Sequence, residues 1–121
     1  MKKLLVAALL GACACSHAAD GGPLLAMCEK ALSKPGVGVN SQNAFHAGYC
    51  MGVLDAAFDA LVMEPIERSK GPGLCPKEDS KDPLTLVNVV VKYLKANPQT
   101  HAQPSSVAVR KALRAAFPCH S

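Results

Sequence analysis

The chain has 121 residues, half of them hydrophobic, and a formal charge of +4 at neutral pH. Two of its lysines lie in a short leader, and removing that leader lowers the charge to +2, which gives no reason to expect nucleic acid or an anionic membrane as a partner. The length suits a single domain with a core of modest size.

Residues 1–18 have the layout of a secretory signal peptide. Two lysines precede a brief apolar run, which is too short to span a bilayer and ends in small residues. Ser16–Ala18 predicts cleavage after Ala18, so residues 19–121 should form one domain in the periplasm, with no membrane partner in the mature form. A less favoured alternative takes Leu10–Cys13 as a lipoprotein box in which Cys13 is acylated.

Four cysteines remain in the mature chain: Cys28, Cys50, Cys75 and Cys119. An even number in a small exported domain predicts two disulfides, although four cysteines allow three pairings. A tight turn between the first two helices, and an antiparallel arrangement of the last two, would favour Cys28–Cys50 and Cys75–Cys119. Closing loops of this size would contribute about 3–4 kcal/mol each.

Proline and glycine divide the mature chain into four segments with helical periodicity. The first two are expected at Leu24–Leu32 and Gln42–Met63, the second capped by Asn40 or Ser41. The third has Asp82 as its N-cap and Pro83 at the first helical position, and ends at Asn97-Pro98; the fourth begins at Ser105 or Ser106 and stops before Pro118. The apolar residues expected to face the core are Leu24, Cys28, Ala31, Leu32, Ala47, Cys50, Leu54, Ala57, Leu61, Val87, Val90, Val91, Leu94, Val109, Ala112, Leu113 and Ala116. The predicted class is therefore all-α, a small bundle of four to five helices stapled by two disulfides.

Gly48 and Gly52 lie one turn apart in the second helix. Glycine inside a helix costs nearly 1 kcal/mol relative to alanine, so two in one turn need a structural reason. We expect a neighbouring helix to approach the backbone closely at this point.

No catalytic, metal or cofactor site is predicted. His46 and Cys50 are four residues apart, but two ligands do not make a zinc site. Asp55 and Asp59 have the same spacing and are interpreted as a solvated face. Cysteines consumed in disulfides leave no thiolate for nucleophilic catalysis. We therefore expect a protein that is not an enzyme.

Several short motifs occur in an order typical of one known family. They are a leading cysteine, Gly48–Val53, Cys75-Pro76, Val90–Leu94 with Asn97-Pro98, and Ala112-Leu113 before a closing Phe117-Pro118-Cys119. In this order the chain resembles the Rap/Tai family of immunity proteins against type VI secretion amidase effectors. The resemblance implies a periplasmic, disulfide-bonded, non-catalytic homodimer that binds a peptidoglycan amidase and blocks its catalytic cleft.

The first candidate for the part that enters the partner is Arg68–Lys81, which lies within the connection Glu64–Asp82. This connection has 19 residues and nine charged side chains, and long loops of this kind are often functional. Because Cys75 would tie it to the domain, it could bind with little loss of conformational entropy. A second candidate is the turn around Pro98, His101 and Pro104. The residues expected to contact the partner are Arg68, Lys70, Lys77, Glu78, Asp79, Lys81 and His101.

A periplasmic stress chaperone is the alternative function. Such a protein is also small, helical and disulfide-bonded, but it would expose apolar surface under acid and would have no dedicated effector.

Overall fold

The computed structural model describes residues 20–33, 40–63 and 74–119, which form four α-helices and two short 3-10 helices with no β-strand among them. In chain order the elements are α1 (Gly21–Ala31), α2 (Ser41–Val62), η1 (Glu78–Lys81), α3 (Pro83–Ala96), η2 (Pro98–Ala102) and α4 (Ser105–Ala116). The all-α prediction is confirmed. The expected leader lies outside the described residues. No helix of the described part is long and apolar enough to cross a membrane.

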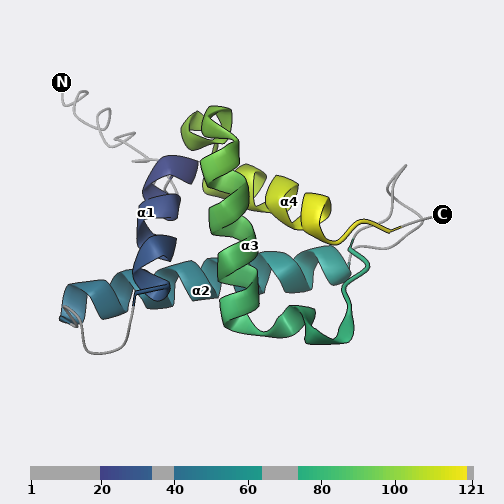
Figure 1. Cartoon of the computed structure of the whole chain (residues 1–121), viewed down its shortest axis with the longest axis horizontal. Coiled ribbons are helices and arrows are strands. Elements are labelled where there is room, and N and C mark those ends of the chain that lie inside the picture. Colours follow the sequence, from purple (N-terminus) through teal and green to yellow (C-terminus); the bar gives the residue numbers. More distant parts are fainter. Residues whose placement is uncertain (1–19, 34–39, 64–73, 120–121) are drawn as a thin grey trace, which may run out of the picture.

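The longest helix, α2, contacts each of the other three α-helices. Figure 1 shows that α1 and α3 cross α2 and run in opposite directions. Helix α4 extends from α3 on the side away from α1. The core lies where the four helices meet. Its buried apolar residues are Leu24, Cys28, Cys50, Leu54, Phe58, Leu61, Leu74, Leu86, Val87, Val90, Val91, Leu94, Ala108, Val109, Ala112 and Leu113.

Two helix starts are fixed by the caps that the sequence predicts. The Asn40 side chain accepts a hydrogen bond from the backbone N–H of Asn43 at 2.8 Å. The Asp82 carboxylate accepts from the backbone N–H of Thr85 at 2.8 Å and from its hydroxyl at 3.0 Å. Each cap satisfies an N–H that the first turn of a helix leaves without a partner, so α2 and α3 begin at defined positions.

The first helix begins three residues earlier than predicted, within Gly21-Gly22-Pro23. Such a sequence is typical of loops, but here tertiary contacts hold it in the helix. The N–H of Gly21 donates to the carbonyl of Gln103 at 2.9 Å, and a side chain on Gly21 would collide with the carbonyl oxygen of Thr100. Glycine therefore lets the start of α1 lie directly against η2.

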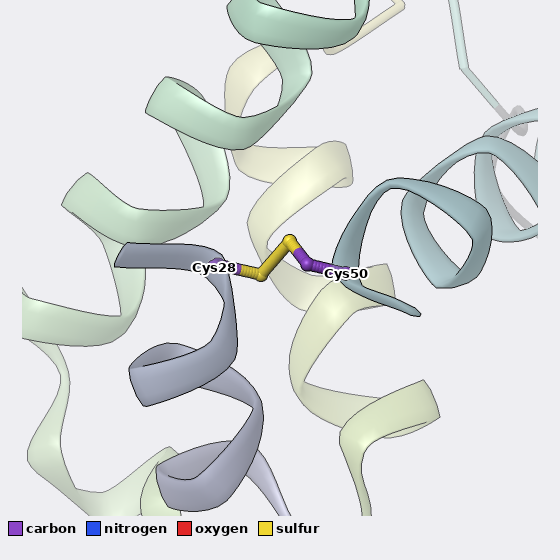
Figure 2. Close-up of a disulfide and its surroundings, with 2 residues drawn as sticks. All are labelled: Cys28 and Cys50. Carbon is purple, nitrogen blue, oxygen red and sulfur yellow. A yellow bond between two sulfur atoms is a disulfide. The ribbon is translucent and has the colours of Figure 1, made fainter. Parts of the chain in front are cut away.

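Both predicted disulfides are present. Cys28 and Cys50 are fully buried and join α1 to α2 with their Cα atoms 5.1 Å apart (Figure 2). Cys75 and Cys119 have their Cα atoms 4.9 Å apart. The second pair meets because the chain at Cys75 runs beside the end of α4, where the N–H of Cys75 donates to the carbonyl of Phe117 at 3.1 Å. Figure 1 shows α4 crossing α3, so an antiparallel pair of helices is not the cause.

The expected close approach at Gly48 and Gly52 is wrong. Both glycines are exposed, and a Cβ added at either would meet nothing within 4 Å. The reason is helical geometry: residues two positions from Cys50 are rotated by about 200° around α2, so they face away from the helix to which Cys50 is bonded.

Replacing either glycine by alanine should stabilise the protein. We expect Gly48→Ala and Gly52→Ala each to raise the free energy of unfolding by about 0.5–1 kcal/mol, because alanine restricts the unfolded chain and meets no obstacle in the helix. Thermal denaturation followed by circular dichroism would measure the change. A loss of stability would contradict the exposure of these two positions.

Candidate partner-binding surface

The charged segment predicted to contact a partner is described only from Leu74 onward, so Arg68 and Lys70 lie outside the described residues. The remaining predicted residues of this segment are all exposed and lie in η1 or immediately before it. They are Lys77, Glu78, Asp79 and Lys81.

This short helix is fixed at both ends. The disulfide at Cys75 precedes it, and Asp82, which caps α3, follows it. Ser80 is 4% exposed, and its N–H donates to the carbonyl of Lys77 at 2.9 Å. Burial of Ser80 anchors the turn, so the charged residues on either side of it face solvent from a defined backbone.

One charged residue of η1 also contacts the body of the protein. The Lys81 ammonium lies 3.7 Å from a carboxylate oxygen of Asp59 in α2 and 6.0 Å from the centre of the Phe58 ring. Both partners of the ion pair are more than half exposed, so the pair contributes little to stability. The ion pair therefore leaves the Lys81 ammonium largely accessible to solvent.

His101 lies far from this group. It is in η2, at the opposite end of α3 from η1 (Figure 1). Its side chain is half-buried, and the ring nitrogen Nε2 donates to the carbonyl of Leu94 at 2.8 Å. The two predicted contact regions are thus separate surfaces, and in the second of them the histidine ties η2 to the end of α3.

An apolar groove between the middle of α2 and the first turn of α3 was not predicted from the sequence. Its volume is about 250 Å³. It is lined by Met51, Gly52, Leu54, Asp55, Pro83 and Leu86. Helical periodicity cannot reveal such a groove, because the groove lies at the boundary between the buried and the exposed face of each helix. Gly52, which was expected to meet a neighbouring helix, instead lies at the groove.

The N-terminal half of α2 presents apolar side chains to solvent. Phe45 is 67% exposed, and its ring centre lies 6.5 Å from that of Tyr49. Gly48, one turn from Phe45, leaves the backbone uncovered. The whole of α2, with 22 residues, contains only two charged side chains, Asp55 and Asp59. A helix that is apolar on most sides is usually buried against other parts of a protein. The exposed face of α2 is therefore a candidate contact surface.

The described residues offer little for catalysis. All four cysteines among the described residues are in disulfides, so none of these four can provide a thiolate, and Cys50 is not available to share a metal with His46. Within the described ranges no group of three His, Cys, Asp or Glu side chains is placed to hold a metal ion.

The family model of the Rap1a immunity proteins matches residues 20–119. The chain belongs to this family. The matched range includes every described helix and both disulfides, so the Rap1a assignment covers the whole described fold. Immunity proteins act by binding a cognate effector and are generally not enzymes. No curated protein and no solved structure matches the chain.

Proposed function

We propose that this Rap1a-family protein is a periplasmic immunity protein that binds a type VI secretion peptidoglycan amidase and inhibits it by occluding the active-site cleft. The family match over residues 20–119 carries the proposal. The two disulfides support an exported protein, because such bonds persist in oxidising compartments. A cleavable leader over residues 1–18 would supply the export.

The segment that enters the cleft is proposed to be the one that ends in η1. Its charged side chains are exposed on a backbone held by Cys75 and by the Asp82 cap. A contact that is already ordered loses less conformational entropy on binding, which favours tight inhibition. Arg68 and Lys70 belong to the same segment and are included in the proposal, with His101 as a secondary contact.

A variant with four alanines in place of Lys77, Glu78, Asp79 and Lys81 should lose inhibition while keeping its fold. We expect the inhibition constant to rise by about tenfold or more, since removing interface contacts worth about 1.4 kcal/mol has this effect. The melting temperature should change by only a few degrees, because the side chains are exposed and the ion pair of Lys81 with Asp59 is weak. The measurements are hydrolysis of purified peptidoglycan by a candidate type VI secretion amidase that the wild-type protein inhibits, and thermal denaturation.

The matched control carries four alanines on α1 and α3, at Glu29, Lys30, Lys92 and Lys95. These residues are also exposed, and they include the ion pair between Lys95 and Glu29 at 2.8 Å. The control should inhibit normally. Full inhibition by the η1 variant would move the contact surface elsewhere. A wild-type protein that does not bind the amidase but prevents aggregation of unrelated proteins at acid pH would favour the chaperone alternative.

We also propose that the protein is a homodimer whose contact includes the exposed N-terminal half of α2. The Phe45 ring projects from the helix, and the open backbone at Gly48 is one turn away on the same face. A projection and a recess on one helix can complement each other across a two-fold axis, as the interface of a symmetric dimer requires.

Phe45→Glu should therefore convert the dimer to a monomer. A charge at this position would be buried without a partner in the dimer, whereas it is solvated in the monomer. Size-exclusion chromatography with light scattering gives the mass directly. Val107→Glu on α4, which replaces a residue that is 40% exposed, serves as the control and should leave the mass unchanged. A dimer that survives Phe45→Glu would place the interface elsewhere, and a monomeric wild type would exclude the homodimer but not the immunity function.

A further inference from the structure

We propose that the groove between α2 and α3 receives a lysine or arginine side chain of the protein partner. The apolar wall of the groove would cover the methylene stem, and the carboxylate of Asp55 would bind the charged end. That the partner is an effector rests on the proposed function, whereas the preference of the groove for a cation on an apolar stem can be tested without one.

The size of the groove suits one side chain. Sites for cofactors and drug-sized ligands usually have about 300–1,000 Å³, and a cavity of about 150 Å³ can hold benzene. At about 250 Å³ this groove lies between the two. A single long side chain fits that volume, and a cofactor does not.

The walls of the groove are preformed. Leu54 and Leu86 are 1% and 2% exposed and belong to the core, and Pro83 is held in the capped first turn of α3. Met51 is partly buried and has a flexible thioether that can adapt to a stem. Gly52 keeps the edge open, because it carries no side chain and nothing lies within 4 Å of where one would begin.

The charge of the groove is negative and unpaired. Asp55 is exposed, and no described residue forms an ion pair with it. Two nearby carboxylates are already used: Asp59 pairs with Lys81, and Asp82 caps α3. Since α2 contains no lysine or arginine, the cation for Asp55 has to come from another molecule or from outside this helix.

Other occupants fit less well. A purely apolar side chain would strip water from the Asp55 carboxylate without replacing its hydrogen bonds, and an acidic one would be repelled. The α2 face proposed for dimerisation contains no lysine or arginine, so this face of a second copy does not provide such a side chain. Lysine and arginine combine an apolar stem with a cationic end, and these two parts complement the apolar walls of the groove and the Asp55 carboxylate.

A titration with small probes tests this preference. Mature protein labelled with ¹³C in its methionine methyl groups reports at three positions, Met27, Met51 and Met63, of which only Met51 lines the groove. The probes share a four-carbon stem and differ at the end: butylammonium, butylguanidinium, 1-butanol and butyrate, at constant ionic strength. We expect the two cations to shift the Met51 signal with a Kd on the order of 10–100 mM, the range for fragments of this size, and at least about threefold more tightly than 1-butanol.

Asp55→Asn should remove the preference for cations, because the amide carries no charge. The proposal is overturned if the cations shift Met51 no more than 1-butanol does, if Met63 responds as strongly as Met51, or if Met51 does not respond at all. None of these results depends on the amidase.

A second measurement asks whether the partner uses the groove. Gly52→Leu would block it, and Ala60→Leu adds the same side chain at another exposed position of α2. We expect Gly52→Leu to weaken amidase binding at least tenfold and Ala60→Leu to leave it unchanged. Equal binding by both variants would overturn the role of the groove while the immunity function stands. Absence of binding by the wild type would overturn the immunity function, and the probe titration would still decide the chemistry of the groove.

Discussion

Replacing both Cys28 and Cys50 by alanine is expected to lower the free energy of unfolding by about 3–5 kcal/mol. The bond closes a loop of 22 residues, which accounts for about 3.5 kcal/mol through the entropy of the unfolded chain. Both cysteines are fully buried where α1 meets α2, so alanine also leaves a small void. A domain of this size has a total stability of about 5–15 kcal/mol, and a loss of this size lowers the melting temperature by roughly 15–25 °C.

The companion variant, with alanine at Cys75 and Cys119, should lose less, about 1–2 kcal/mol. Its loop is longer, at 44 residues, but Cys75 is exposed and Cys119 is half-buried, so removing this bond leaves no void in the core. Circular dichroism melts of the two variants, exported to the periplasm, would give both values. Equal losses would contradict the assignment of the first bond to the core.

Gly21→Ala should destabilise the protein by about 2–3 kcal/mol, the usual cost of forcing an atom into a packed site. The new methyl group would collide with the carbonyl oxygen of Thr100 and lie 3.2 Å from the Cβ of Ala108. The obstacle is backbone of η2, which cannot move without disturbing Thr100, a residue that is 1% exposed.

The adjacent glycine provides the control for this substitution. At Gly22 the nearest atoms to an added Cβ belong to His101, at 3.4 Å, which is ordinary contact. Gly22→Ala should therefore leave the melting temperature within about 2 °C of the wild type, or raise it slightly. If the two alanine variants melted at the same temperature, α1 would not lie as closely on η2 as described.

The features that could be predicted from sequence are those with a local cause. Asp82 with Pro83, and Asn40 before α2, indicate helix starts through hydrogen bonds within one turn, and both are confirmed. The spacing of Val87, Val90 and Leu94 indicates a buried face, also confirmed. The pairing of the cysteines was predicted correctly, although the route by which Cys75 reaches Cys119 was not.

The features that could not be predicted depend on contacts between distant segments. The glycines at the start of α1 are helical only because η2 lies against them. Ala116 was expected in the core but is exposed, because periodicity continues to the end of a helix whether or not a neighbour extends that far. Gly48 and Gly52 were interpreted as a buried contact, although their rotation relative to Cys50 places them outside.

The contact surface itself stays a prediction, and the sequence indicates only some of its structural features. A high density of charge identified the segment that includes η1, but not its anchoring through Ser80. The groove at Asp55 arises where α2 passes the first turn of α3, and no pattern within either helix indicates that crossing.

The two disulfides close separate loops that do not overlap in the sequence. One loop spans residues 28–50 and the other spans residues 75–119. No covalent bridge connects α1 and α2 to α3 and α4 except the main chain between them. A single peptide-bond cut between residues 51 and 74 would thus yield two fragments, each cyclised by its own cystine. Only non-covalent contacts would keep them associated, among them the packing of the helices, the hydrogen bond from Gly21 to Gln103 and the ion pair between Lys95 and Glu29.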